Sequence, residues 1–297
     1  MNAKKVLRYM KDREQGFRWE DNYEPAGEVE LFGDDVPCGR QVKRTVTNNG
    51  VTEDVDVWTP PVLKGEGSHR PPRASRESVR SWLTDPTTNR EIGSSSHLEM
   101  KCTYQLMANR RVIEIIDQHP TVSYPDENGE LHQTRYDFMF TLDDTRKIAI
   151  AIKPADKVEK RGLNRIIRAS LPELRKVADD AIILTDIELS AERLWNNKTI
   201  LRARRLRNQS DVDFLLRELG QWHGVFSAFD LARLHPSVAR GEVAVWLLIY
   251  EGVLKMLHPE RRLCDAPSVF VEQSMLARKL NSGTIHPKIE KENGDEL

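Results

Sequence analysis

Residues 135–153 read RYDFMFTLDDTRKIAIAIK, and this stretch predicts two strands joined by a turn. Its first part alternates aromatic side chains with other residues, which is typical of a strand with one apolar face. Asp143 and Asp144 then interrupt the run, as a tight turn does. The run Ile148–Ile152 is apolar at every position, which predicts a second strand in the middle of its sheet.

A hairpin of this kind brings two charged side chains together. Asp137 lies on the first strand, and Lys153 follows the second. A carboxylate and an ammonium group beside a buried strand can hold a divalent cation and an attacking water. The alternative is an ordinary surface hairpin with a polar residue at each end.

The preceding segment adds a second acidic residue. The sequence SSSHLE at 94–99 predicts a helix start with a serine cap and places Glu99 in the first turn. An apolar stripe at helical spacing extends this predicted helix to residue 116. A short strand is expected next, at 118–124, followed by a turn at 126–129. The stripe consists of Leu98, Cys102, Leu106, Ile113 and Ile116.

The order helix with Glu, strand with Asp, and strand ending in Lys resembles the PD-(D/E)xK nuclease core. The wider pattern is similar to TnsA, the endonuclease subunit of heteromeric cut-and-paste transposases. The resemblance covers roughly residues 85–260. Its pieces are SSSHLE (94–99), IIDQHPTVSY (115–124), RYDFMF (135–140), AIAIKPADKVEKRGLNRI (149–166) and ILTDIELSAERLWNN (183–197).

The resemblance implies an α/β fold with a restriction-endonuclease-like mixed sheet flanked by helices, and a C-terminal winged-helix-like domain. It implies that Glu99 and Asp137 bind Mg²⁺ or Mn²⁺, which lowers the pKa of a bound water. Lys153 would position that water or stabilise charge on the phosphate. The implied partners are double-stranded DNA, a DDE-type transposase subunit (TnsB-like) and an AAA+ ATPase regulator (TnsC-like).

One position departs from the family pattern. Members usually carry a polar or acidic residue two places before the lysine, where this chain has Ala151. Three explanations stay open. The metal is held by Asp137, a backbone carbonyl such as that of Ile152, and water; another acid has moved in; or the protein is catalytically weak or dead. His97 is a further candidate to assist a metal, or else a surface histidine.

The basic residues that follow the core suggest a DNA track, or alternatively a solvated helix face. A helix is expected over 156–178, interrupted at Pro172. The second cluster lies near residue 204 and is the densest in the chain. The predicted DNA-binding residues are Lys157, Lys160, Arg161, Arg165, Arg202, Arg204 and Arg205.

The chain divides by pattern into four parts. Residues 1–84 form an N-terminal extension with short strands expected at 28–32, 41–46 and 52–58 and a linker at 65–75. Residues 85–190 form the nuclease domain. Residues 191–275 form the winged-helix-like domain, with helices at 211–219, 227–234 and 238–252, then a hairpin of 253–257 and 268–272. Asp211 is the expected N-cap of the first helix. Residues 276–297 are a predicted disordered tail.

Composition sets limits on the class of protein. The net charge is −1 over 297 residues, so a DNA-binding surface must be local. The three cysteines, Cys38, Cys102 and Cys264, have neither zinc spacing nor a disulfide pattern, which favours a reducing compartment. No membrane span or signal peptide is visible, and a cytoplasmic location is expected.

Three functions compete. The first is a metal-dependent DNA endonuclease that cleaves the 5′ ends of a mobile element. The second is another PD-(D/E)xK nuclease of restriction, defence or phage origin. The third is a degenerate nuclease fold kept as a scaffold that binds DNA or a partner, and Ala151 is its main support.

Overall fold

The computed structural model describes residues 40–48, 51–59, 62–67, 79–160 and 162–281. The chain forms two compact units, residues 1–63 and 64–297. In the first unit, β1 (Arg40–Asn48) and β2 (Val51–Thr59) form an antiparallel hairpin, which confirms the strands predicted at 41–46 and 52–58. The strand predicted at 28–32 lies outside the described residues. Most of the predicted linker, residues 68–75, lies outside the described residues.

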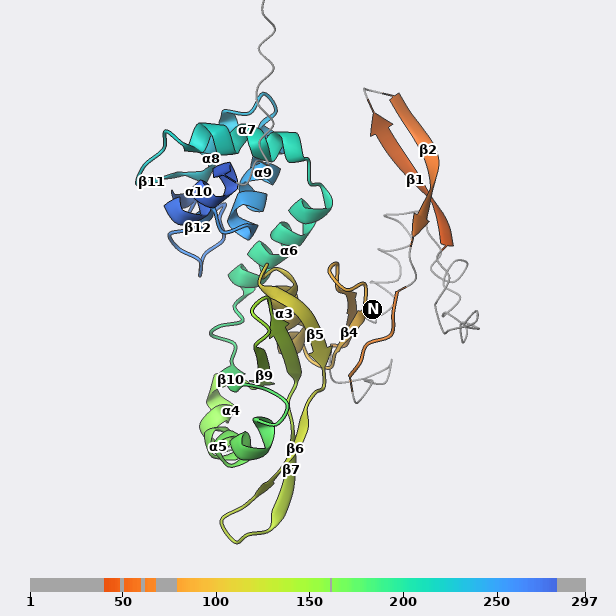
Figure 1. Cartoon of the computed structure of the whole chain (residues 1–297), viewed down its shortest axis with the longest axis vertical. Coiled ribbons are helices and arrows are strands. Elements are labelled where there is room, and N and C mark those ends of the chain that lie inside the picture. Colours follow the sequence, from red (N-terminus) through yellow and green to blue (C-terminus); the bar gives the residue numbers. More distant parts are fainter. Residues whose placement is uncertain (1–39, 49–50, 60–61, 68–78, 161, 282–297) are drawn as a thin grey trace, which may run out of the picture. The chain divides into compact units, whose positions relative to one another are not determined.

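The centre of the second unit is a mixed four-stranded sheet in the order β10-β9-β8-β5 (Figure 1). β9 is parallel to β10 on one side and antiparallel to β8 on the other, so the apolar IAIAI run is central, as predicted. β8 pairs antiparallel with β5. The strands are β5 (Val112–Asp117), β8 (Phe138–Leu142), β9 (Lys147–Ile152) and β10 (Asp180–Leu184).

Strand alternation sends side chains into two apolar clusters, one on each face of this sheet. Phe138, Phe140 and Ile150 belong to the larger cluster, together with Cys102 and Leu106. The larger cluster continues into the helices after residue 190. The smaller cluster contains alternate residues of the same strands with side chains from the following helix, namely Met139, Ala149, Ala151, Leu163 and Leu174. The sheet is therefore covered on both faces, which explains why β9 is apolar throughout.

The helix that carries Glu99 is shorter than predicted. Helix α3 (His97–Met107) begins at the N-cap Ser96, whose side chain accepts a hydrogen bond from the Glu99 N–H at 3.1 Å, as the serine run indicated. The extension to residue 116 was wrong, because the chain turns at 108–111 and continues as β5. Ile113 and Ile116 are strand residues. The run VIEII has β-branched side chains, which suit a strand better than a helix.

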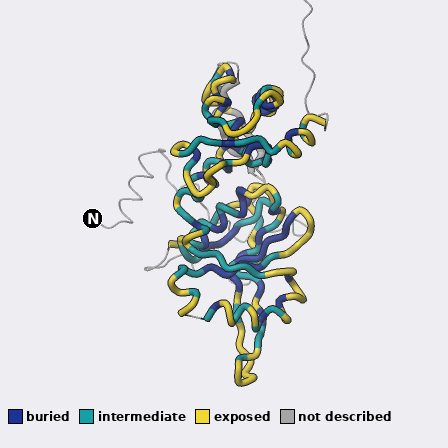
Figure 2. Tube along the Cα trace, turned by 90° about the vertical axis from the view of Figure 1, so that its left-hand side faces the viewer, coloured by how far each residue is buried: buried dark blue, intermediate teal, exposed yellow. Residues whose placement is uncertain are grey.

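The strand predicted at 118–124 lies outside the core sheet. β6 (Thr121–Pro125) pairs only with β7 (Leu131–Arg135) in the described part of the chain, and together they form a two-stranded arm. Figure 1 shows this arm extending from the sheet, and Figure 2 shows exposed residues at its end. A separate two-stranded ladder, β3 (Ser81–Thr84) with β4 (Glu91–Ser94), precedes α3.

The helical segment after Lys153 is broken at a different place from the one predicted. It consists of α4 (Ala155–Lys160) and α5 (Leu163–Leu174). Gly162 separates them with a left-handed backbone, φ 58°, a conformation that glycine adopts without steric cost. Pro172 lies inside α5, in its last turn, and does not interrupt it.

The remaining elements form a helical unit with a small sheet. All three predicted helices and both hairpin strands are present, and the sheet is antiparallel in the order β11-β13-β12. The elements are α6 (Ala191–Arg205), α7 (Gln209–Leu219), β11 (Val225–Ser227), α8 (Ala228–Arg233), α9 (Val238–Tyr250), β12 (Leu254–Met256), β13 (Ser268–Val271) and α10 (Gln273–Asn281).

Two details of this unit differ from expectation. The N-cap of α7 is Asn208, and Asp211 lies in the first turn. Helix α10 covers residues 276–281 of the predicted disordered tail and buries Leu276. The other residues of that predicted tail, 282–297, lie outside the described residues.

Cys102 is a buried free thiol and Cys264 an exposed one, while Cys38 lies outside the described residues. Across the described ranges, no helix combines the length and the apolar character that crossing a bilayer requires. The cytoplasmic location stays a prediction.

Candidate active site

The predicted hairpin brings Asp137 and Lys153 together at one end of the central strands. Asp137 directly precedes β8, and Lys153 directly follows β9. The Lys153 Nζ lies 3.8 Å from the Asp137 Oδ2. The Lys153 N–H also donates to the Leu184 carbonyl at 3.3 Å, which ties the backbone of the lysine to β10. The lysine side chain is 36% exposed, so its ammonium group is accessible from outside.

The backbone holds the carboxylate of Asp137. The Ile152 N–H donates to the Asp137 Oδ2 at 2.7 Å, and the Asp137 N–H donates to the Ile150 carbonyl at 2.8 Å. Burial raises the pKa of Asp137, and Lys153 and the Ile152 N–H only partly offset that effect. The carboxylate is therefore fixed in position and carries a charge that its surroundings do not fully compensate.

Glu99 is the second acid of this site. Its Oε2 accepts the Ser95 N–H at 2.7 Å, and the residue as a whole is only 8% exposed. Burial raises the pKa of Glu99. The Ser95 N–H opposes this, and the charge of Asp137 adds to it. This carboxylate also has a structural role, because it binds the N–H of the residue just before the N-cap Ser96, one residue upstream of the capping-box position.

The buried thiol of Cys102 is affected by both acids. Its pKa is raised first by burial and then by the charges of Asp137 and Glu99. Two carboxylates and one ammonium group thus lie close enough to influence each other. We call Glu99, Asp137 and Lys153 the acidic centre.

Gln118 belongs beside this centre, although the sequence pattern gave it no role. Its N–H donates to the Asp137 carbonyl at 2.8 Å, and its Nε2 lies 3.5 Å from the Glu99 Oε2. Its backbone is left-handed, with φ 50°, which is uncommon for a residue other than glycine. The signal available in the sequence was a polar residue directly after a strand that neighbours the strand following Asp137. The strand was placed wrongly, so the signal was missed.

Ala151 provides no ligand to the centre. It is buried in the smaller apolar cluster with Leu163 and Leu174. In the described ranges, no third His, Cys, Asp or Glu joins Glu99 and Asp137 at the mutual distances of a metal site. The explanation that another acid has moved in is therefore not supported by the described residues.

The donor set fits a hard divalent cation. Carboxylate oxygens are the protein ligands that Mg²⁺ and Mn²⁺ prefer. Glu99 and Asp137 supply them, and both have raised pKa values because burial penalises their charges. A cation between them would offset that penalty. His97 is exposed at the start of α3.

The predicted DNA-binding residues are distributed over α4, α5 and α6. Lys157, Lys160 and Arg165 are exposed. Lys160 pairs with Asp156 at 3.9 Å, and Arg165 pairs with Glu127 of the β6–β7 arm at 2.7 Å. Exposed pairs of this kind are weak and can exchange for phosphate. Arg161 lies outside the described residues, and Arg202 and Arg205 are exposed on α6.

Arg204 has contacts within the protein. Its guanidinium lies over the Tyr250 ring, 4.7 Å from the ring centre, and donates to the Met107 carbonyl at 2.9 Å. A weaker bond reaches the Thr87 hydroxyl at 3.4 Å. These contacts join α6 to the end of α3 and to α9, so Arg204 has a structural role. DNA binding by the seven residues stays a prediction.

A second group of possible metal ligands lies on the β6–β7 arm. Asp126, Glu130 and His132 bring one ligand atom each within 4.8 Å of one another. Asp126 accepts the N–H groups of Asn128 at 2.8 Å and Glu130 at 2.9 Å, and its Oδ2 lies 3.2 Å from the His132 Nε2. These bonds, the Glu130 N–H first, lower the pKa of Asp126. They form the turn of the arm, which is sufficient to explain the cluster.

The chain matches no protein-family model and no curated protein.

Proposed function

We propose that the protein is a metal-dependent DNA endonuclease resembling TnsA, which cleaves the 5′ ends of a mobile element during cut-and-paste transposition. The observation that carries the proposal is the acidic centre. Two buried carboxylates with raised pKa values lie beside one lysine, whose Nζ is 3.8 Å from the Asp137 Oδ2, at the end of a central strand. Buried groups with perturbed pKa values of this kind are more common at functional sites than elsewhere.

Each residue of the centre has a distinct role in this proposal. Glu99 and Asp137 hold a Mg²⁺ or Mn²⁺ ion, which when bound supplies a water of lowered pKa and charge stabilisation at the phosphate. Lys153 orients the attacking water or stabilises negative charge on the phosphate through its partly exposed ammonium group. Ile152 fixes the orientation of Asp137 through its N–H.

The arrangement of the elements supports the same proposal. Asp137 precedes β8 and Lys153 follows the antiparallel neighbour β9, so both lie at the same end of the mixed sheet. The PD-(D/E)xK resemblance implies this arrangement. The order α7, β11, α8, α9, β12, β13 is consistent with a winged-helix-like unit. Helix α9 buries six of its 13 residues, five of them in the continuous run Ala244–Leu248, which favours a role in packing or partner binding over insertion into a DNA groove. The partners in this proposal are a DDE-type transposase and an AAA+ ATPase.

A second candidate is a nuclease fold kept as a DNA-binding or partner-binding scaffold. The burial of Ala151 in an apolar cluster favours it, because this position supplies no metal ligand. The two candidates differ in one property that does not require partners: the nuclease binds a divalent cation at Glu99 and Asp137, and the scaffold does not.

The deciding experiment uses labelled element ends, a DDE-type transposase and an AAA+ ATPase as candidate partners, and Mg²⁺ or Mn²⁺. We expect nicks at the 5′ ends of the element that disappear with a chelator and with Asp137→Ala. Nicks at unrelated sites without the partners would instead indicate another kind of nuclease. Failure to bind Mn²⁺ by calorimetry, together with absence of nicking, would favour the scaffold.

A further inference from the structure

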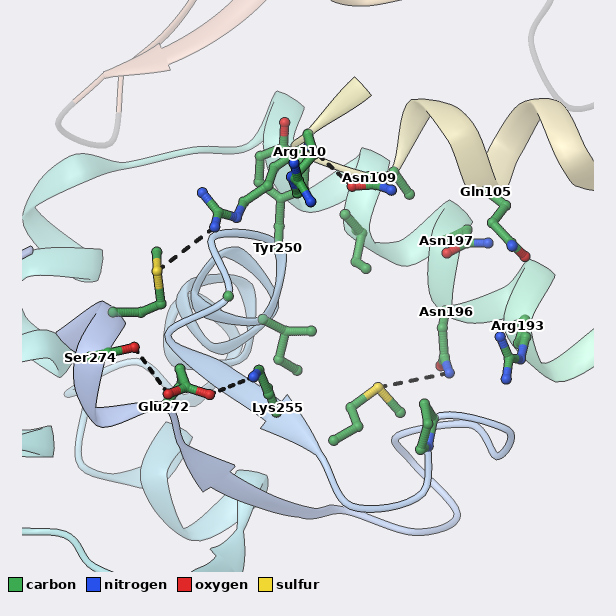
Figure 3. A pocket seen from close by; sticks show the side chains of 18 residues that line it. Gln105, Asn109, Arg110, Arg193, Asn196, Asn197, Tyr250, Lys255, Glu272 and Ser274 are labelled. Atoms are coloured by element: carbon green, nitrogen blue, oxygen red, sulfur yellow. Dashed lines mark hydrogen bonds and ion pairs between the residues drawn. The ribbon is translucent and has the colours of Figure 1, made fainter. Parts of the chain in front are cut away.

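A large groove lies away from the acidic centre, between α3 and the C-terminal elements. Its volume is about 690 Å³. Figure 3 shows that its side chains come from the end of α3 and the following turn, from α6, from the end of α9, and from β12 and α10. None of the described residues that are predicted to bind DNA lines it, so it is separate from the surface that they form.

The groove is rich in cationic side chains. Arg110, Arg111, Arg193 and Lys255 line it, against the single lining acid Glu272. Three further side chains offer amide N–H donors, namely Gln105, Asn109 and Asn197. This combination of guanidinium, ammonium and amide donors is the one proteins use for phosphate oxygens.

Two of the four cations are already neutralised within the protein. Arg111 binds Asp143 at 3.0 Å and Asp144 at 2.6 Å. Lys255 forms an ion pair with Glu272 across the β12–β13 end of the groove. The positive charge that the groove can offer to a ligand therefore comes from Arg110 and Arg193.

Arg110 and Arg193 form no ion pair with any described residue. Arg110 extends over Gly252, where an added Cβ would lie 3.4 Å from its Nε, and its Nη2 lies 3.8 Å from the Met275 sulfur. Sulfur is a weak acceptor, so most of the hydrogen-bonding capacity of this guanidinium is left for a ligand. Arg193 contributes to lowering the pKa of Glu188, after the larger effects of hydrogen bonds from Thr185, without pairing with it.

We propose that this groove binds the phosphate backbone of a nucleic-acid strand through Arg110 and Arg193, with the amides as additional donors. The ligand fits the site because DNA presents a regular row of phosphates, and each guanidinium can bind one in a bidentate manner. The acidic centre and the groove share α3. Glu99 lies in the first turn and Gln105 six residues later, about 9 Å along the helix axis at ~1.5 Å per residue. The acidic centre and the groove are therefore both built on this one helix.

The inference goes beyond the proposed function, because binding in the groove requires neither the cation nor cleavage. It shares only the ligand, DNA. Its test is accordingly made in a chelator, so that cleavage is not part of the measurement.

The experiment compares the double variant Arg110→Ala/Arg193→Ala with the matched control Arg217→Ala/Arg278→Ala. The control removes two exposed arginines of the same unit that lie outside the groove. Fluorescence anisotropy with a short duplex gives the association constant over a range of salt concentrations. At ~0.9 per phosphate contact, we expect the logarithmic salt slope to become shallower by about 1.8 in the groove variant and to stay unchanged in the control. Arg110→Lys/Arg193→Lys should restore the slope, because charge is retained.

Three results would overturn the inference. The first is an equal slope for the wild type and the folded groove variant, with folding checked by circular dichroism. The second is a loss that the lysine variant does not restore. The third is groove-dependent binding of polyglutamate with an unchanged DNA slope, which would identify an acidic peptide as the ligand. A groove that binds DNA in a protein that never cuts would contradict the proposed function alone.

Discussion

Two buried carboxylate clusters in this protein are built in opposite ways. In the acidic centre, Asp137 has one ammonium group at 3.8 Å, and its pKa is raised. In the helical unit, Asp211 binds Arg240 through both carboxylate oxygens and also lies 3.1 Å from the His235 Nε2. Burial alone would raise the pKa of Asp211, but Arg240 and His235 together hold it below its usual range.

The cluster around Asp211 is complete by itself. The His235 Nδ1 lies 3.0 Å from the Ser237 backbone nitrogen and 2.9 Å from the Ser237 carbonyl oxygen, and the Nε2 on the other side of the ring faces Asp211. Asp211 comes from α7, His235 from the α8–α9 connection and Arg240 from α9. The cluster joins three segments and satisfies every charge, as a structural cluster must. The acidic centre lacks this compensation, which is the physical reason to expect a cation there.

The largest effect is expected from a substitution of Asp137, the less compensated of the two aspartates. Asp137→Asn removes a metal-ligand charge but keeps an oxygen that can accept the Ile152 N–H. We expect cleavage to fall to background and stabilisation by Mn²⁺ to disappear, because one of two carboxylates is lost. Thermal unfolding in a chelator should show a stability equal to or above that of the wild type, because burial of a charge is avoided. A large loss of stability in the chelator would show that Asp137 is structural.

Lys153→Ala is the next largest expected effect. We expect cleavage to fall by about a hundredfold or more, as when one preorganised charge is removed from a transition state. Overall DNA affinity should change little, because one phosphate contact is a small part of a polyelectrolyte interface. Lys176→Ala is the control, because Lys176 is exposed and is not among the predicted DNA-binding residues. Equal cleavage rates for Lys153→Ala and wild type would remove the lysine from the mechanism.

In the other cluster, Asp211→Asn should affect stability and not chemistry. We expect the free energy of unfolding to fall by about 2 kcal/mol, because the Arg240 ion pair is lost and His235 keeps only a weaker partner. Asp230→Asn is the control, because Asp230 is 59% exposed and Arg233 is its one ion-pair partner among the described residues. Its effect should stay within about 0.5 kcal/mol. Denaturant unfolding measures both variants.

The contribution of Asp211 to stability should depend on pH, with a sign that follows from its lowered pKa. The folded-state pKa of Asp211 is lowered, so its contribution to stability is complete above the unfolded value of about 3.9. The contribution is lost as the pH falls through the lower folded-state pKa. The stability difference between wild type and Asp211→Asn should therefore be constant near neutral pH and shrink in acid. A difference that grows in acid would contradict the assigned ion pair.

The smallest expected effect concerns Gln118, the neutral neighbour of the acidic centre. Gln118→Leu removes an amide that lies 3.5 Å from the Glu99 Oε2. We expect Mn²⁺ affinity to weaken by about tenfold, the lower end of the usual effect of losing a partner of a metal ligand. Gln133→Leu, at an exposed position on β7, is the control. Calorimetry gives both affinities, and equal values would exclude Gln118 from the site.

Local patterns were sufficient for much of the fold. The serine cap of α3, the turn at Asp143–Asp144 and the central position of β9 all follow from a few neighbouring residues. The coarse class, a mixed sheet with helices on both faces, follows from the same alternation. The pairing of Asp137 with Lys153 was predictable too, because a hairpin register depends on the turn that joins its strands.

The errors occurred where several local structures compete. The residues of β5 fit a helical stripe as well as a strand, and only pairing with β8 decides between them. The break in the helical segment is at Gly162, whose left-handed backbone precedes α5, and Pro172 is accommodated in the last turn of α5.

The sequence by itself determined the residue types of the acidic centre and the hairpin that joins Asp137 to Lys153. Only the tertiary structure decided which neighbours surround them. Gln118 reaches Glu99 because β5 lies beside β8. Asp211 is neutralised by Arg240, which is 29 residues away. Charge compensation depends on distances of a few ångströms between groups far apart in the chain, and such distances are set by packing and not by local pattern.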